Sequence, residues 1–210
     1  MTARTDLRMY GGKPVRDRRA ERRAEFIAAG LTVFGEFGYA RSSISALCAA
    51  AGLARSQFYE HFANREDLML AVYDTLQTDA GNAVRQAVAA QPSTDVAVRA
   101  RAAIGAYVAS IGVDPHRAAV SFVQSVGISE RVEQHRTERH RLWAVFFEEE
   151  ARRALGDNTV PVGGYEYAAT AFIGAVITVI QKWSNSQARP SIEVVTALLT
   201  RILIALLAEK

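Results

Sequence analysis

The sequence has few of the residues that cross-link, break or anchor a chain. Among 210 residues there is one cysteine, Cys48, so no internal disulfide can form and a reducing compartment is favoured. We expect Cys48, which lies in the apolar run 46–51, to be a small buried side chain rather than a reactive thiol. Only five prolines are present, which excludes a proline-rich or collagen-like architecture.

Long uncharged stretches and targeting signals are also scarce. The longest stretch without a charged residue, Tyr167 to Gln181, has 15 residues, whereas a membrane-spanning helix needs about 20. A basic segment precedes the apolar residues 26–35, as in a secretory signal. However, Glu25 and Glu36 flank that run, and no small-x-small cleavage site follows it. We therefore expect a cytoplasmic protein with no membrane partner.

Charge is distributed unevenly along the chain. The net charge is only +3, but residues 1–23 hold eight basic side chains against the three acids Asp6, Asp17 and Glu21, a net of +5. The remaining residues therefore carry 3 − 5 = −2. The basic side chains of this segment are Arg4, Arg8, Lys13, Arg16, Arg18, Arg19, Arg22 and Arg23. With Gly11, Gly12 and Pro14 in it, the segment 1–16 is expected to be a disordered basic arm.

Hydrophobic spacing predicts helix almost throughout. Apolar residues recur at i, i+3 and i+4, and alternating apolar and polar runs are scarce. We predict an all-α fold of about nine helices, over residues 17–37, 44–51, 55–62, 65–90, 95–113, 116–126, 129–155, 165–187 and 190 to the C-terminus. The predicted domains are the arm 1–16, a first domain 17–64 and a second domain 65–210.

The segment from Ser43 to Phe62 has the most informative pattern. Two short helices joined by a tight turn at Gly52 predict a helix-turn-helix, whose second helix enters the major groove of DNA. The side chains expected to face inward are Ile44, Leu47, Cys48, Leu53, Phe58 and Phe62. Those on the other face are hydrogen-bond donors suited to bases and phosphates: Arg55, Ser56, Gln57, Tyr59 and His61.

A longer motif surrounds this segment. It reads Gly38-Tyr39-x-x-Ser42-Ser43-Ile44-x-x-Leu47-Cys48-x-x-Ala51-Gly52-Leu53-Ala54-x-x-x-Phe58-Tyr59-x-His61-Phe62-x-x-Arg65-Glu66-x-Leu68. The motif resembles the N-terminal signature of the TetR family of bacterial transcriptional regulators. This resemblance implies an N-terminal three-helix helix-turn-helix DNA-binding domain, followed by a helical ligand-binding and dimerisation domain.

The resemblance also implies roles for individual residues. Ser42 and Ser43 would contact a phosphate at the start of the second helix, and Arg55, Ser56 and Gln57 would meet base edges. The expected phosphate-binding side chains after them are Tyr59, His61 and Arg65. Glu60 is either a solvated helix position or an acceptor of a hydrogen bond from a cytosine amine. The basic arm is either a solvated tail or a source of phosphate and minor-groove contacts.

The C-terminal two-thirds contain no motif for catalysis. His135 and His140 are spaced i, i+5, about 140° apart around a helix, so they do not form the metal-binding H-E-x-x-H pattern. There is no glycine-rich phosphate loop, and no arrangement of serine, histidine and acid can be argued. We predict a protein that is not an enzyme and holds no metal or cofactor.

Under the same resemblance, the C-terminal part surrounds an apolar cavity for a small effector. The candidate lining residues are Tyr107, His116, Phe122, Gln124, His140, Trp143, Phe147, Tyr165 and Phe172. The last two helices are apolar on most faces and must be buried, which pairing with a second copy as a four-helix bundle would achieve. The candidate dimer-interface residues are Ala171, Ala175, Thr178, Val195, Leu199 and Ile202.

The leading hypothesis is a homodimeric, ligand-responsive transcriptional regulator, most often a repressor in this family. It would bind a palindromic DNA operator and be released or retuned by a small apolar or amphipathic effector. Two alternatives stay open: a sequence-neutral DNA-binding protein that uses the basic arm, and an all-helical small-molecule-binding protein without regulation. A regulator is distinguished from the first by discrimination of about 10³ or more between its operator and other DNA.

Overall fold

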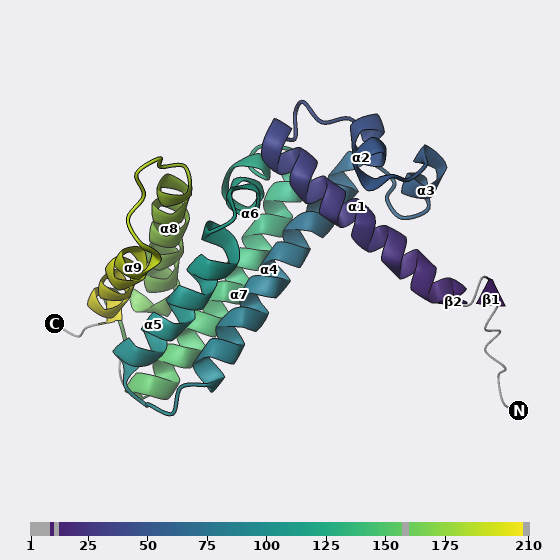
Figure 1. Ribbon diagram of the computed structural model, residues 1–210. Coiled ribbons are helices and arrows are strands. Elements are labelled where there is room, and N and C mark those ends of the chain that lie inside the picture. Colours follow the sequence, from purple (N-terminus) through teal and green to yellow (C-terminus); the bar gives the residue numbers. More distant parts are fainter. Residues whose placement is uncertain (1–8, 11–12, 157–159, 208–210) are drawn as a thin grey trace, which may run out of the picture. The chain divides into compact units, whose positions relative to one another are not determined.

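The computed structural model describes residues 9–10, 13–156 and 160–207, with side chains from Arg18 onward. Within these ranges the chain forms nine α-helices, two π-helical segments and one pair of two-residue strands (Figure 1). The strands β1 (Met9–Tyr10) and β2 (Lys13–Pro14) are antiparallel, with Met9 opposite Pro14. The predicted all-α fold is confirmed.

Part of the segment 1–16, which was expected to be a disordered arm, lies within the described ranges and has secondary structure. Residues 1–8 and 11–12 lie outside the described ranges, but β1, β2 and the start of α1 (Val15–Phe37) account for the rest of residues 1–16. The strand pair ends at Pro14, which has no backbone N–H to continue a ladder. Helix α1 therefore begins at Val15, two residues before the predicted start.

The chain divides into two compact units, Met1–Val72 and Tyr73–Lys210. Helix α4 (Arg65–Ala89) contributes to both, so the division falls inside this helix and not at the predicted position between residues 64 and 65. The reason is the close packing of its first turns on α1. A Cβ atom added at Gly30 would lie 2.9 Å from Val72 Cγ2, and Leu68 is the next neighbour.

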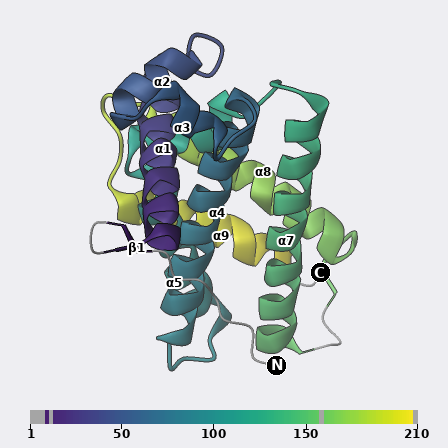
Figure 2. The same cartoon turned by 90° about the vertical axis from the view of Figure 1, so that its right-hand side faces the viewer.

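The first unit contains the predicted helix-turn-helix. Helix α2 (Ile44–Ala51) begins where the Ser43 hydroxyl accepts a hydrogen bond from the Ala46 N–H at 3.1 Å. It ends at Gly52, whose φ of +65° belongs to the left-handed region that favours glycine. Helix α3 (Arg55–Tyr59) follows, and Figure 2 shows both helices beside α1.

An aromatic cluster fills the core of this unit. Phe26 lies edge-on to Phe58 and Phe62, at ring-centroid distances of 5.4 and 6.2 Å, and all three side chains are buried. The predicted helix 55–62 is regular only to Tyr59, because the chain then tightens into a turn in which the His61 N–H donates to the Phe58 carbonyl at 3.0 Å. Cys48 is buried, as predicted.

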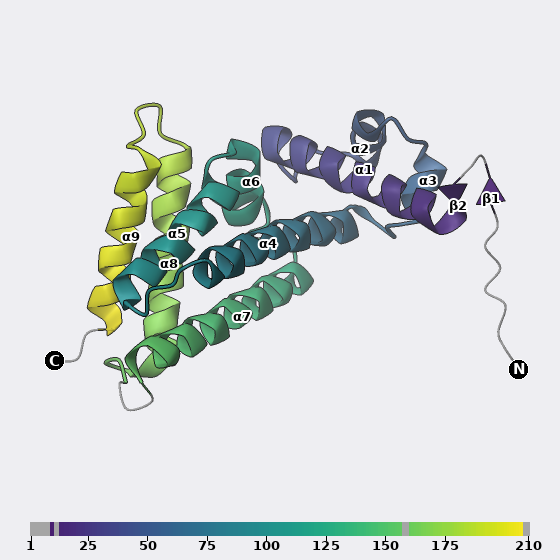
Figure 3. The ribbon, with the colours of Figure 1, turned by 60° about the horizontal axis from the view of Figure 1, so that its bottom comes forward.

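The second unit packs the rest of α4 with α5 (Val96–Tyr107), α7 (Glu130–Leu155), α8 (Gly164–Ser184) and α9 (Ile192–Leu207). Helices α4 and α7 lie side by side, joined by hydrogen bonds from Arg139 to Asp74 and from Trp143 to Gln77, and α8 and α9 form an antiparallel hairpin (Figure 3). Helix α9 also packs on α5, and α8 packs on α7. These helices enclose the interior of the unit.

Two helices of this unit change character along their length. Helix α5 continues as the π-helical segment η1 (Val108–Gly112), and α6 (Pro115–Ala119) continues as η2 (Val120–Gln124). The sequence predicted uninterrupted helices at 95–113 and 116–126, because apolar periodicity does not distinguish the two forms. At Gly112 an added Cβ would lie 2.8 Å from Ile180 Cγ2, so η1 approaches α8 closely.

Within the described ranges, no single helix has the length and hydropathy to cross a membrane, although the bent pair Val96–Gly112 and Pro115–Gln124 meets both criteria together. The same ranges contain no group of three or more His, Cys, Asp or Glu residues that could hold a metal ion.

Candidate DNA-binding surface and effector cavity

Helix α3 turns three of the predicted polar residues outward. Arg55, Ser56 and Tyr59 are exposed, whereas Phe58 on the opposite face is fully buried. The Arg55 Nη2 atom donates to the Tyr59 hydroxyl at 3.3 Å, and the Cζ atom of the Arg55 guanidinium lies 5.8 Å from the Tyr59 ring centroid. The core thus fixes α3 while its outer face presents a cation, a hydroxyl and a phenol.

Gln57, expected to meet a base edge, has one end of its amide already in use. Its Oε1 atom accepts a hydrogen bond from the Ala54 N–H at 2.8 Å, which satisfies a free donor at the start of α3. Ala54 has no polar side chain, so Gln57 supplies the polar group there. This hydrogen bond does not use the amide nitrogen of Gln57, which carries two donors.

The two serines before α2 differ from each other. Ser43 is exposed and caps α2. Ser42 is buried, and its hydroxyl donates to the Tyr39 carbonyl at 2.8 Å. This hidden, occupied hydroxyl argues against the phosphate contact expected of the Ser42 side chain.

Arg65 and His61 are both tied to the fold of the first unit. The Arg65 guanidinium lies 4.2 Å from the Tyr39 ring centroid and donates to the Ser42 carbonyl. The His61 ring packs against Phe26 at 6.3 Å, and its Nε2 atom is buried without a hydrogen-bond partner. Burial, followed by the charge of Arg19, lowers the pKa of His61. This packing argues against a phosphate contact through Nε2.

Arginines of α1 reach the end of α3, which the sequence analysis did not foresee. Arg19 donates to the Glu60 carbonyl at 3.1 Å, Arg22 lies 3.8 Å from the Glu60 carboxylate, and Arg23 lies over the Phe62 ring. Glu60 is thus an exposed ion-pair partner, worth at most about 1 kcal/mol. The sequence pattern that could have predicted these contacts is the run of charged residues over 18–23.

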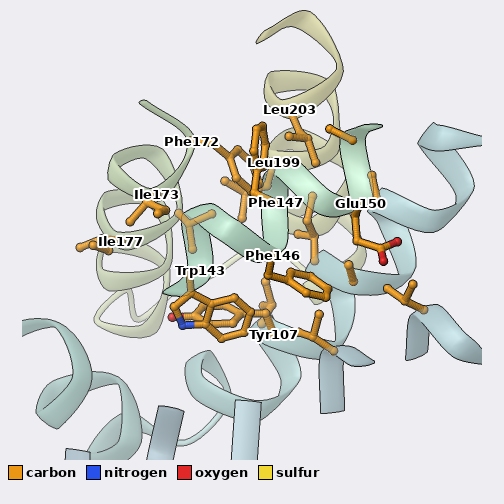
Figure 4. A pocket seen from close by; sticks show the side chains of 18 of the residues that line it. Tyr107, Trp143, Phe146, Phe147, Glu150, Phe172, Ile173, Ile177, Leu199 and Leu203 are labelled. Atoms are coloured by element: carbon orange, nitrogen blue, oxygen red, sulfur yellow. The ribbon is translucent and has the colours of Figure 1, made fainter. Parts of the chain in front are cut away.

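A cavity opens inside the second unit. Its volume is about 150 Å³, and most of its lining is apolar (Figure 4). Six of the nine predicted residues line it: Tyr107, Phe122, His140, Trp143, Phe147 and Phe172.

The other three predicted lining residues lie elsewhere. His116 is in the first turn of α6, where its backbone N–H donates to the Asp114 carboxylate at 2.8 Å. Tyr165 is buried beneath the Arg152 guanidinium, 4.7 Å from its ring centroid. Gln124 closes η2 and is half-buried. These three residues are therefore not part of the lining of this cavity, because an aromatic or polar residue on a helix does not reveal which way it faces.

Sequence reasoning also missed several polar lining residues. The Trp143 indole N–H donates to the Gln77 side-chain carbonyl at 2.9 Å, joining α7 to α4. Arg99 of α5 pairs with Glu150 of α7 at 2.7 Å, with each side chain about one-fifth exposed. Tyr73 and Gln77 are spaced i, i+4 on α4, so a helical-face argument for α4 could have found them. No local pattern in the sequence indicates that Arg99 and Glu150 form an ion pair.

The predicted dimer-interface residues fall into two groups. Ala171 and Thr178 are exposed, and Ala175 and Ile202 are half-buried. Val195 and Leu199 are buried inside the subunit, and Leu199 lines the cavity, so these two predictions are wrong for a surface between copies. One residue turns a helix by about 100°. The neighbouring apolar side chains Val194 and Leu198 are accordingly exposed, as is Tyr167 on α8.

Comparison with known proteins gives the family of the N-terminal residues. Residues 26–72 match the family described as "Bacterial regulatory proteins, tetR family". The HTH-type transcriptional activator FasR of Mycolicibacterium smegmatis is 33% identical over 89 residues. That alignment covers 42% of this chain and 40% of the relative, so the chain matches less than half the length of FasR.

Solved structures extend the likeness to the whole fold. The regulator FadR from Bacillus subtilis, in complex with stearoyl-CoA, has a TM-score of 0.73 at 14% identity and covers 87% of this chain and 97% of its own. AibR, in complex with isovaleryl coenzyme A and operator DNA, has a TM-score of 0.67 at 17% identity, with coverages of 85% and 96%. Residues 26–72 are therefore similar in sequence to the tetR family of bacterial regulatory proteins, and the chain has a fold similar to those of FadR and AibR.

Proposed function

We propose that the protein is a ligand-responsive transcriptional regulator, a repressor that binds a palindromic operator as a homodimer and is released by an apolar or amphipathic effector. One observation supports this most: a tetR-type helix-turn-helix with a filled aromatic core presents Arg55, Ser56 and Tyr59 on the exposed face of α3. A core that fixes one helix and leaves polar donors on its outer face is suited to reading base edges.

In this proposal α3 enters the major groove. Arg55 would donate two hydrogen bonds to a guanine, and Ser56 can serve either base type. Tyr59 supports Arg55 in the free protein through the 3.3 Å hydrogen bond, and this limits the side-chain freedom that binding must remove. Arg19, Arg22 and Arg23 would add phosphate contacts, which set position and not sequence.

The homodimer would form through the free faces of α8 and α9. Tyr167 is 72% exposed, Val194 56% and Leu198 48%, while Ala171 next to them is small enough for close approach. Two such hairpins can form a four-helix bundle with a self-complementary interface. The two recognition helices would then lie about 34–36 Å apart, one turn of DNA.

The effector would bind in the cavity of the second unit. The cavity is lined mainly by apolar side chains, as effector pockets are, and the fold relatives FadR and AibR were solved with acyl-coenzyme A molecules. Helix α4 provides a route to the DNA-binding unit, since Tyr73 and Gln77 line the cavity while Leu68 packs on α1. Differential affinity for two states, typically about 1–3 kcal/mol, would change the affinity for DNA.

The test is binding of the full chain to the DNA upstream of its own gene, measured by fluorescence anisotropy against unrelated DNA. Arg55→Ala should weaken operator binding by about 1–3 kcal/mol and relax the preference at one base position. Arg141→Ala is the matched control, because Arg141 in the second unit is an exposed arginine with a 3.6 Å ion pair to Glu138. It should leave binding unchanged.

The proposal fails if no sequence outcompetes bulk DNA, which would favour a sequence-neutral DNA-binding protein. An unchanged base preference in Arg55→Ala would remove the assigned role of Arg55. A reporter gene placed behind the bound sequence shows whether the protein represses or activates transcription. We expect lower expression, as for a repressor. Higher expression would make the protein an activator, as the relative FasR is named.

A further inference from the structure

The effector cavity has two ends of different chemistry. At one end the Arg99 guanidinium pairs with the Glu150 carboxylate at 2.7 Å and also reaches the Val88 carbonyl at 3.5 Å. At the other end Trp143 donates to Gln77, and the Tyr107 ring lies edge-on to the Trp143 indole at 5.3 Å. Figure 4 shows Glu150 well apart from Trp143 and Tyr107. One end is therefore closed by an internal ion pair, and the other is ringed by aromatic side chains.

The cavity lining also contains hydrogen-bonding groups that are uncharged. They come from four different elements, α4, α5, η2 and α7, and they are Gln77, Tyr107, Ser121 and His140. Burial raises the pKa of Tyr107 far above its ordinary value, so its hydroxyl keeps its proton at neutral pH. Burial, followed by the charge of Arg136, lowers the pKa of His140, so its ring is neutral.

Ser121 is the most informative member of this group. Ser121 borders the cavity and is 3% exposed, and its buried Oγ atom has no hydrogen-bond partner among the described residues. A buried polar group without a partner costs about 1–3 kcal/mol. Ser121 also lies in the π-helical segment η2, and such segments are frequent at functional sites. A ligand atom that bonded this hydroxyl would remove the cost.

The arginines near this end are already paired. Arg136 Nη1 lies 2.7 Å from the Glu133 carboxylate, while its Nε atom is buried without a partner, and Arg139 Nε and His135 Nε2 each lie 2.7 Å from Asp74 Oδ1. None of these three residues lines the cavity. The aromatic end therefore offers donors and acceptors to a ligand but no cation to balance a carboxylate and no anion to balance an amine.

We propose that the cavity takes a ligand with an aliphatic or aromatic body and one uncharged oxygen function, such as a hydroxyl or an ester-type carbonyl, bonded by Ser121 and Tyr107. This inference rests on the proposed function, because it treats the cavity as the effector site. A free carboxylate is selected against at the aromatic end, since Arg99, the cation that the structure describes in the lining, is held by Glu150 at the other end, and burying an unpaired charge is far more costly than burying a hydrogen-bonded hydroxyl. A thioester carbonyl belongs to the accepted class.

Three probes with one carbon chain test the ligand class: lauryl alcohol, methyl laurate and laurate, titrated calorimetrically into the full-length protein at neutral pH. The alcohol and the ester should bind, and laurate should bind at least about tenfold more weakly, because its charge must be desolvated without a partner. Equal affinity for laurate and the alcohol would overturn the proposal. So would a failure of both uncharged probes to bind.

Two variants test the assigned hydroxyl. Ser121→Ala should lower the affinity for lauryl alcohol by about threefold to tenfold, the loss of one neutral hydrogen bond. Ser125→Ala is the matched control: Ser125 is also buried, but its hydroxyl donates to the Ser121 carbonyl and it does not line the cavity. It should bind the alcohol as the wild type does.

A stability measurement separates a ligand role from a structural one. Without ligand, Ser121→Ala should be as stable as the wild type or more stable, because it removes an unpartnered hydroxyl. A lower Tm in the ligand-free variant, or unchanged alcohol affinity, overturns the role of Ser121. Operator binding without ligand tests the proposed function alone. If the protein does not bind an operator, the proposed function fails. If it binds an operator but the ligand tests give the contrary results, only this inference fails.

Discussion

The two units use the same residue type in opposite ways. In the first unit Phe26, Phe34 and Phe58 are fully buried, the Phe26 ring packs edge-on against Phe58, and Phe34 packs against Tyr39. In the second unit Trp143 packs edge-on to Tyr107 and Phe146, yet these rings line a cavity. Aromatic side chains fill one unit and surround a cavity in the other.

This difference matches what each unit is proposed to do. A filled core holds α3 in one geometry, so that side chains such as Arg55 are presented to DNA without rearrangement. A hollow core lacks the packing energy that a ligand can supply, and a ligand that binds only one state stabilises that state in proportion to its concentration and affinity. The first unit is therefore expected to be rigid, and the second to respond to ligand.

The largest expected effect compares truncation of one phenylalanine in each unit. Phe58→Ala should destabilise the first unit by about 3–5 kcal/mol, since Phe58 is fully buried among Phe26, Tyr59 and Phe62. Phe147→Ala should cost clearly less, about 1–2 kcal/mol, because Phe147 is half-buried and already borders empty space. Urea unfolding followed by circular dichroism measures both, and equal costs would contradict a filled and a hollow core.

Local signals explain how much of the first unit could be predicted. The start of α2 at Ser43 and its end at Gly52 follow from side-chain capping and from a positive φ, both of which depend on adjacent residues. The burial of Ser42 and the packing of His61 against Phe26 depend on how helices meet in space. This burial and packing argue against the phosphate contacts expected of the two side chains, and no local signal in the sequence indicated either of them.

The second unit depends more on contacts between distant residues, and less of it could be predicted. Aromatic content led correctly to Tyr107 and Trp143, but Arg99 and Glu150 meet only after α5 and α7 have packed. Helix α9 shows that the exposed face of a helix is hard to predict. The sequence analysis placed Leu199 on the dimer surface, whereas the structure buries Leu199 and exposes its neighbour Leu198. On a helix that is apolar on most sides, periodicity does not decide which face turns inward.

A smaller effect, about 1 kcal/mol of stability, is expected from removing one helix cap in each unit. The Ser43 hydroxyl accepts from the Ala46 N–H at 3.1 Å, and the Ser129 hydroxyl accepts from the Val132 N–H at 3.2 Å at the start of α7. Ser43→Ala and Ser129→Ala should therefore destabilise their helices similarly in thermal unfolding.

Operator binding separates the two caps. Only Ser43→Ala should weaken it, because α2 precedes the recognition helix and Ser43 is itself a candidate phosphate contact, and Ser43→Thr should restore it by keeping the hydroxyl. If Ser129→Ala weakened operator binding equally, the cap in the second unit would influence DNA reading as strongly as the one in the first.

The smallest effect is a pH dependence of stability from His140. Its pKa in the folded protein is lowered, chiefly by burial, so between that pKa and the ordinary value of about 6.5 the unfolded chain binds more protons than the folded one. Stability must then fall as the pH is lowered through this window, by at most about 1.4 kcal/mol per pH unit for one group. The urea midpoint at about pH 7 and about pH 5.5 measures it.

His140→Gln should flatten this acid slope, because the glutamine cannot titrate. His61 in the first unit also has a lowered pKa, so His61→Gln is the matched variant. The two differ in their response to ligand: His140 lines the cavity and His61 does not. A bound uncharged ligand removes water from His140 and should steepen the slope in the wild type and in His61→Gln, but not in His140→Gln. A ligand effect that persisted in His140→Gln would show that the cavity senses acid through another group.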